Sequence, residues 1–310
     1  MSGQTEQTRV VASETAQIDP TGPRKLTRAE KRAVEAKNRL SSPAASIIAL
    51  LIALLWTVPT LGLLVTSVRT RNDIQADGWW NAFARPLFTG YNYTSALETG
   101  LGENFVNTLV ITVPAVVIPI TLALLAAYAF AWIPFRGREL LFVAVFALQV
   151  VPIQVTLIPL LSLYVDTGIA GSFWTVWLSH AMFGLPLAIF LLHNFMKDIP
   201  ASLVEAARMD GAGHVTIFFK VLLPLLVPAI AAFGVFQFLW VWNDLLVALT
   251  FAGSGATPLT SAIADLAGTR GNAWFLLAPG AFLAMLVPLV VFIALQRFFV
   301  RGLLAGSVKG

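Results

Sequence analysis

The chain has 310 residues, of which 57% are hydrophobic and only 12% are charged, and its formal net charge is +4. A soluble domain of this length needs far more charge on its surface, so the composition predicts an integral membrane protein. The sequence contains no cysteine, which excludes a disulfide framework and a thiolate-ligated metal site.

The first 42 residues are polar and charged, and they contain one candidate helix. Thr27 and Glu30 have the spacing of a capping box in front of the basic run RAVEAKNRL. We expect residues 1–42 to form a partly disordered extension whose short basic helix lies against anionic lipid headgroups. Binding of a partner protein is the alternative role for this helix.

Six apolar segments are long enough to cross a bilayer, which takes about 20 residues. Together they predict an all-α membrane domain over residues 43–310. Proline inside several of them, as at Pro152 and Pro159, favours kinked helices that line a pathway, although membrane helices in general are rich in proline. The segments comprise residues 44–68, 105–133, 140–164, 173–196, 221–243 and 273–296, and none contains Lys, Arg, Asp or Glu.

The positions of the basic residues predict the orientation of the chain. If the N-terminus is cytoplasmic, all but Arg69, Arg71, Arg85 and Arg270 of the 20 Lys and Arg residues lie on the cytoplasmic side. We therefore expect both termini in the cytoplasm. The positive charges flank membrane spans instead of forming one groove, so the basic pI of about 9.6 does not indicate nucleic acid.

The longest external segment, residues 69–104, is rich in aromatic residues. Trp79, Trp80, Tyr91 and Tyr93 all lie in it. Such residues are typical of the belt at a membrane–water interface, and a docking surface for an external partner is the alternative.

The segment between the fourth and fifth spans, about residues 198–220, contains the polar string EAARMDGAGH. Pro200 ends the preceding segment, and Ser202 and Glu205 have the spacing of a capping box. Glycine supplies backbone freedom that other residues lack, so Gly211 is expected to end this short helix.

A second short helix is expected from about His214, which makes the segment a helix–turn–helix elbow on the cytoplasmic side of the membrane. A plain interfacial loop is the alternative. On the first helix, we expect three exposed apolar side chains that can contact a partner, namely Leu203, Val204 and Met209.

This string resembles the EAA loop of permease subunits in ATP-binding-cassette importers. That family shows Glu-Ala-Ala, then Asp-Gly-Ala beginning three positions after the second alanine, and later a Leu-Pro. The matching positions are Glu205, Ala206, Ala207, Asp210, Gly211, Ala212, Leu223 and Pro224.

Other segments are similar to the carbohydrate branch of the family, the maltose-type permeases, and the resemblance covers residues 44–310. The matching strings are FTGYNYTSAL at 88–97, NFVNTLVIT at 104–112, AAYAFAWIPFRGR at 126–138, WNDLL at 242–246 and LQRFFVRGLLAGSVKG at 295–310.

The resemblance implies the transmembrane domain of a type I importer, with six spans in a bacterial inner membrane. The elbow would be the coupling helix, docked on a cytoplasmic ATPase dimer that also meets Lys309 near the C-terminus. Because the chain lacks the phosphate-binding motif GxxxxGK[ST], ATP and Mg²⁺ would be held by that separate ATPase. The other implied partners are a second homologous permease and an external sugar-binding protein, and the implied substrate is an oligosaccharide such as an α-glucoside.

A sugar pathway needs hydrogen-bonding side chains and aromatic faces within an apolar wall. In maltose-type systems the partner permease can hold most sugar contacts. Substitution of Asn243 or Asp244 is expected to lower uptake without loss of assembly, although Asp244 can instead be hydrated near the outer interface. The candidates are Gln149, Gln154, Gln237, Trp240, Trp242, Asn243 and Asp244.

Two other classes of membrane protein compete with the importer. An ion- or proton-coupled carrier usually places ionisable residues at mid-membrane, and the six spans offer almost none. A membrane enzyme would need a motif such as HExxH or GxSxG, and neither occurs. His180 and His193 lack a carboxylate or third histidine at metal-ligand spacing, so we expect packed or interfacial histidines and no metal site.

Overall fold

The computed structural model describes residues 43–268 and 271–307, with side chains as far as residue 296. The expected extension 1–42 with its short helix, and Lys309, lie outside these residues. The chain divides into two compact units between Pro59 and Thr60. Helix α2 (Pro43–Ser67) crosses that boundary, and the contacts described below lie within the second unit.

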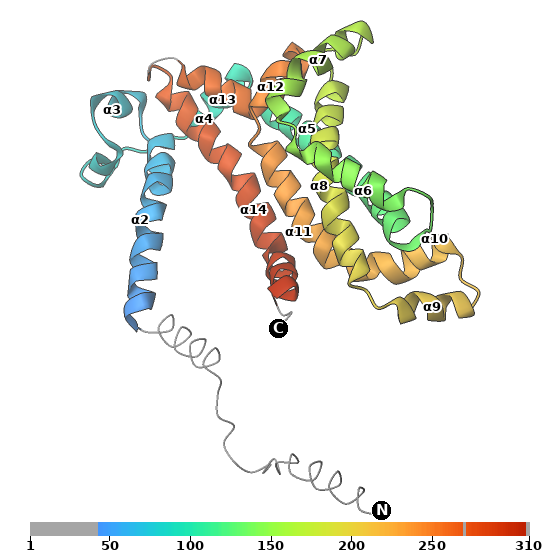
Figure 1. Ribbon diagram of the computed structural model, residues 1–310. Coiled ribbons are helices and arrows are strands. Elements are labelled where there is room, and N and C mark those ends of the chain that lie inside the picture. The colour runs from blue at the N-terminus through green and yellow to red at the C-terminus, as the bar shows by residue number, and fades with distance from the viewer. Residues whose placement is uncertain (1–42, 269–270, 308–310) are drawn as a thin grey trace, which may run out of the picture. The chain divides into compact units, whose positions relative to one another are not determined.

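The second unit is a bundle of long apolar helices (Figure 1). Within the described ranges, five helical stretches of the chain are long and apolar enough to span a membrane, and a sixth span is obtained if one bent pair counts as a span. These stretches coincide with the six expected segments, so the all-α membrane fold is confirmed. The long helices of the second unit are α5 (Gly102–Trp132), α8 (Phe173–Lys197), α11 (Leu223–Trp242) and α14 (Trp274–Ser307), and α2 lies across the boundary between the units.

The third expected span is broken. It consists of α6 (Arg138–Ala147), the 3-10 turn η3 (Leu148–Val150) and α7 (Ile153–Asp166), bent by 99°. Pro152 lies at the break, where it has no N–H to continue the helix and forces the residue before it into an extended conformation. The span expected over 140–164 is therefore present as a bent pair of helices, and the break at Pro152 agrees with the kink that this proline predicts.

The expected external segment is folded. Buried Arg69 hydrogen-bonds to the Asp77 carboxylate, which holds the pKa of Asp77 below its usual value. The Asn92 amide donates to the carbonyls of Ser67 and Arg69, at 3.0 and 2.7 Å. Trp80 stays 62% exposed, and whether such side chains meet lipid or a partner stays a prediction. The elements here are α3 (Arg71–Ala76), η1 (Trp79–Phe83), α4 (Tyr91–Ala96) and η2 (Leu97–Leu101).

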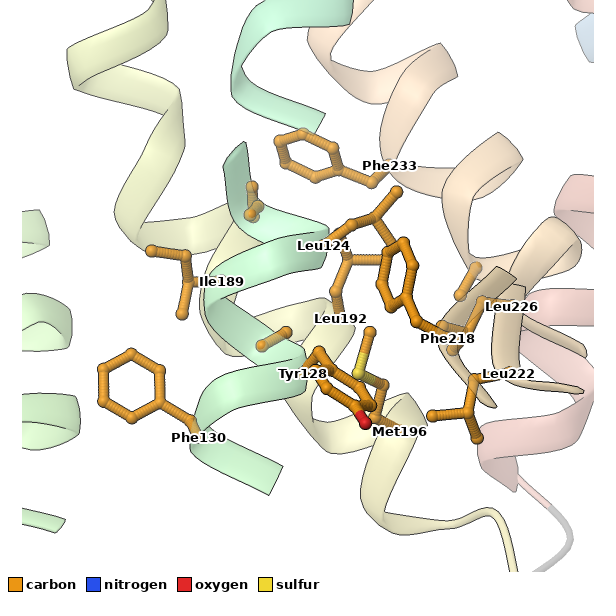
Figure 2. Packing of buried hydrophobic residues seen from close by; sticks show 14 of the residues in the cluster. Leu124, Tyr128, Phe130, Ile189, Leu192, Met196, Phe218, Leu222, Leu226 and Phe233 are labelled. Carbon is orange, nitrogen blue, oxygen red and sulfur yellow. The ribbon is translucent and has the colours of Figure 1, made fainter. Parts of the chain in front are cut away.

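The main hydrophobic core lies between α5, α8 and α11 (Figure 2). Ala123, Ala127 and Ala188 are fully buried, and such small residues let neighbouring membrane helices approach closely. A second cluster, which includes Tyr164 and Phe251, packs α5, α7 and α8 against the short helix that follows α11. The remaining short elements are α12 (Leu246–Phe251), η5 (Ser254–Ala256) and α13 (Leu259–Ala267).

Candidate functional site

The expected elbow protrudes from the end of the bundle opposite to α12 and α13 (Figure 1). It consists of α9 (Ala201–Met209), α10 (His214–Thr216) and the π-helical turn η4 (Ile217–Leu222), which leads into α11. Pro224 lies in the first turn of α11, directly after this π-helical turn. A π-helical turn inside a helix is rare and occurs frequently at functional sites.

The start of α9 differs from the expected capping box. The N-cap residue is Pro200, and no side chain caps this described helix. Because the helix begins at Ala201, Ser202 is already its second residue and cannot cap it. Glu205 is exposed on the helix surface, and its carboxylate makes no hydrogen bond to the start of α9.

The turn after α9 is the one that the glycine predicts. Gly211 has a φ of +80°, which L side chains rarely adopt. Its N–H donates to the Arg208 carbonyl at 3.0 Å, and the Ala212 N–H donates to the Ala207 carbonyl at 2.9 Å. These two bonds form a Schellman motif, which satisfies the last carbonyls of the helix.

Helix α9 contacts the bundle along one narrow face. Val204 is only 1% exposed and Ala207 packs against the main core, because residues three apart share a helix face. The expected exposure of Val204 was therefore wrong, whereas Leu203 and Met209 are exposed as expected. The outward face also carries Glu205, Ala206 and Asp210 of the EAA string.

A pocket of about 890 Å³ lies beside the broken third span, between η3, α7, α8 and α11. Its volume is within the range of small-molecule sites, and its wall is mostly apolar. Four of the seven pathway candidates line it, namely Gln149, Gln154, Gln237 and Trp240.

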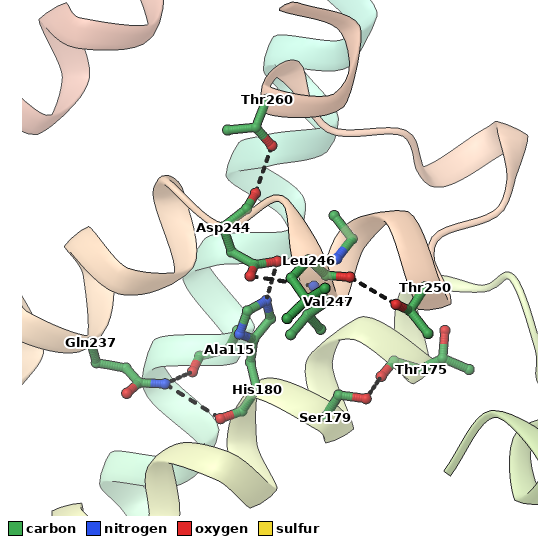
Figure 3. Close-up of polar contacts among 11 residues, drawn as sticks. Ala115, Thr175, Ser179, His180, Gln237, Asp244, Leu246, Val247, Thr250 and Thr260 are labelled. Carbon is green, nitrogen blue, oxygen red and sulfur yellow. Dashed lines mark hydrogen bonds and ion pairs between the residues drawn. The ribbon is translucent and has the colours of Figure 1, made fainter. Parts of the chain in front are cut away.

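Among these four, Gln237 has a clear structural task. It is 1% exposed, and its amide donates to the carbonyls of Ala115 and His180, at 3.2 and 3.5 Å (Figure 3). A Cβ at Gly184 would lie 2.6 Å from its Oε1, so only glycine leaves room for this side chain. Gln237 therefore ties α11 to α5 and α8 at the wall of the pocket.

The other three candidates do not line this pocket. Trp242 is buried and donates its indole N–H to the Ala284 carbonyl at 2.9 Å. The Asn243 amide donates to the Leu239 carbonyl of its own helix at 2.7 Å. Asp244 lies one residue before Leu245, the N-cap of α12, and its carboxylate accepts the backbone N–H groups of Val247 and Ala248 in the first turn (Figure 3). Its side chain is only 9% exposed, so it is not hydrated at an interface.

The structure also pairs Asp244 with a residue outside the candidate list. His180 Nε2 lies 3.6 Å from Asp244 Oδ2, and the His180 ring meets the Trp240 ring edge-on at 5.2 Å. The two residues are far apart in the sequence, so no spacing rule finds this pair. His180 and His193 are both buried, and no group of three His, Asp or Glu residues suited to a metal occurs in the described part of the chain.

The sequence matches the family described as "Binding-protein-dependent transport system inner membrane component" over residues 119–305. It is 55% identical to the osmoprotective compounds uptake permease protein GgtD of Synechocystis sp., over 84% of this chain and 90% of the relative. It is 50% identical to the alpha-glucoside transport system permease protein AglG of Rhizobium meliloti, over 75% of this chain. The match covers 63% of the length of AglG.

A solved structure supports the fold. A chain from the crystal structure of a bacterial ABC transporter involved in the import of the acidic polysaccharide alginate superposes with a TM-score of 0.65 at 22% identity. The match covers 90% of this chain and 100% of that chain. The family match extends over more than half of the sequence and includes the elbow, the broken span and the pocket. This protein therefore belongs to the family of binding-protein-dependent transport system inner membrane components.

Proposed function

We propose that this chain is the permease subunit of an ATP-driven sugar importer, in which it forms half of the translocation pathway. The elbow carries the proposal: α9 protrudes from the bundle, ends in the turn at Gly211, and presents Glu205 outward. A helix held in this way can dock on a separate protein while its inner face stays packed on the bundle.

The proposed importer has three kinds of partner. The elbow and both termini lie in the cytoplasm, where an ATPase dimer that holds ATP and Mg²⁺ receives α9 and the region of Lys309. A second, homologous permease completes the pathway, and an external binding protein delivers the sugar. The name of AglG supports an α-glucoside or a similar oligosaccharide as the substrate.

The movement of α9 can reach the pocket through few contacts. When the ATPase closes on ATP, it displaces α9, whose Val204 and Ala207 press on the core between α5 and α8. Movement of these helices changes the walls of the pocket, where Gln149 and Gln154 offer hydrogen bonds to sugar hydroxyls and Trp240 offers an aromatic face. The chain itself binds no nucleotide and performs no catalysis in this scheme.

One observation favours the competing proton-coupled carrier. The buried His180–Asp244 contact is of the kind that such carriers use for proton transfer. Uptake into ATP-loaded proteoliposomes that an uncoupler does not reduce supports the importer, whereas uptake that a proton gradient drives without ATP supports the carrier.

Reversal of charge at Glu205 is expected to release the ATPase. We expect Glu205→Lys to reduce the ATPase that co-purifies with the permease by about tenfold, because a charge directed at the partner is reversed at the contact. Asp166→Lys is the matched control, since this exposed acid ends α7 at the other end of the bundle (Figure 1). Equal recovery of the ATPase with both variants would show that α9 is not the docking helix.

Removal of a polar group from the pocket is expected to weaken sugar transport without loss of assembly. We expect Gln154→Leu to raise the KM for uptake by roughly fivefold, the effect of one lost hydrogen bond to the sugar. Asn243→Ala is the control, because the Asn243 amide is bonded within its own helix and outside this pocket. A larger effect at Asn243 than at Gln154 would place the sugar route elsewhere.

A further inference from the structure

A second contact joins the elbow to the bundle, and it is polar. Tyr128 lies one turn before the end of α5, and its hydroxyl is hydrogen-bonded to Nδ1 of His214 at 2.7 Å. His214 is the first residue of α10, directly after the turn of the elbow. The bond therefore connects the moving part of the proposed mechanism to a membrane-spanning helix.

The neighbouring rings fix the orientation of the Tyr128 side chain in this contact. Tyr128 is 7% exposed and meets two rings edge-on, His214 at 5.9 Å and Phe218 at 5.4 Å between centroids. Residues four apart share a helix face, so His214 and Phe218 hold the tyrosine ring from the same side of the chain. Figure 2 shows Tyr128 and Phe218 within the same part of the main core.

The contact is made with α5, a helix that extends from the elbow to the wall of the pocket. Near its elbow end α5 packs on α8 through Ala123 and Ala127, and farther along its Ala115 carbonyl accepts the hydrogen bond of Gln237 at the pocket. Helix α5 is continuous from Tyr128 to Ala115, with Pro119 between them, so a displacement of His214 reaches the pocket wall through a single helix.

We propose that the Tyr128–His214 contact transmits the movement of the elbow to α5, and that Tyr128 is a positioning residue for coupling. The proposal rests on the proposed function, since it needs an ATPase that moves the elbow. The Val204 and Ala207 contacts are apolar and allow sliding, whereas the hydrogen bond fixes the register between the elbow and α5 in both directions of movement.

The test uses the complete importer in proteoliposomes, with ATP hydrolysis and uptake of radiolabelled maltose and trehalose measured together. Tyr128→Phe removes the hydroxyl and keeps the ring. We expect it to lower the sugar transported per ATP by about fivefold, the effect of one hydrogen bond, while the ATPase rate and the yield of the complex stay within twofold of wild type. His214→Phe should give the same loss, and the double variant should be no worse than either, because both changes remove one bond.

Tyr164→Phe is the matched control. Tyr164 is also buried and hydrogen-bonded, to Ser179 at 3.0 Å, but it lies in the second hydrophobic cluster, away from the elbow. An unchanged ratio of sugar to ATP in Y128F, an equal loss in Y164F, or a loss of assembled complex in both Y128F and H214F would overturn the proposal. If the wild-type importer shows no ATP-driven uptake of either sugar, the proposed function is contradicted, and this proposal with it. If the wild type transports but the variants do not show the expected loss, only the role of the Tyr128–His214 contact is contradicted.

Discussion

Replacement of Gly211 by proline is expected to abolish ATP-driven uptake. Proline fixes φ near −65°, whereas Gly211 has a φ of +80° and donates its N–H to the Arg208 carbonyl. The substitution therefore loses the Schellman turn and redirects the chain between α9 and α10, at a cost of about 3 kcal/mol or more. Uptake and co-purified ATPase, measured on the complete importer, should both fall to background.

Alanine variants of two glycines, Gly211 and Gly213, separate the effect of a positive φ from the effect of adding a side chain. A Cβ at Gly211 meets no atom within 4 Å, so Gly211→Ala tests the positive φ alone and should cost about 1 kcal/mol. Gly213 also has open space around it but an ordinary φ of −76°, so Gly213→Ala tests only the change of the N-cap of α10 and should cost about 0.5 kcal/mol. If Gly211→Ala and Gly213→Ala behave alike, the left-handed turn is not what positions the elbow.

Asp244→Ala is expected to destabilise the folded protein as well as reduce uptake. The carboxylate accepts two backbone N–H groups of α12 at 3.3 and 3.0 Å and lies beside His180. The alanine variant leaves these buried donors without a partner, which costs about 2 kcal/mol. The yield and the thermal midpoint of the purified complex should fall, in contrast to the sequence-based expectation that assembly persists.

The control for Asp244 is another acid in the same region. Asp265 is exposed on α13, so Asp265→Ala should change the stability by less than about 0.5 kcal/mol. Asp244→Asn keeps one acceptor oxygen for α12 and should fall between the two. If Asp244→Ala assembles at wild-type yield but fails to transport, Asp244 belongs to the sugar route and not to the fold.

Much of this protein is determined by local patterns in the sequence. Apolar length alone predicts the spans, because a bilayer requires about 20 apolar residues whatever the neighbouring helices are. The turn at Gly211 is also predictable, since a glycine after a short helix supplies the positive φ that the turn needs. The string from Glu205 to Ala212 places the elbow, and the family match includes it.

Other features depend on contacts that no local pattern encodes. The helix start at Pro200 replaces the expected Ser202 cap, and Val204 is buried, because docking of α9 on the core decides its register and its inner face. Trp242 and Asp244 have the chemistry of pathway residues, but the packing of α11 turns the first toward Ala284 and the second toward α12.

The His180–Asp244 and Tyr128–His214 contacts join residues that are distant in the chain. Sequence spacing shows which residues share a helix face. Which other helix contacts that face depends on tertiary packing. The sequence by itself therefore determined the spans, the turn and the elbow of this protein. Only the tertiary structure decided which polar side chains support the fold and which line the pocket, because that choice depends on how α5, α8 and α11 pack together.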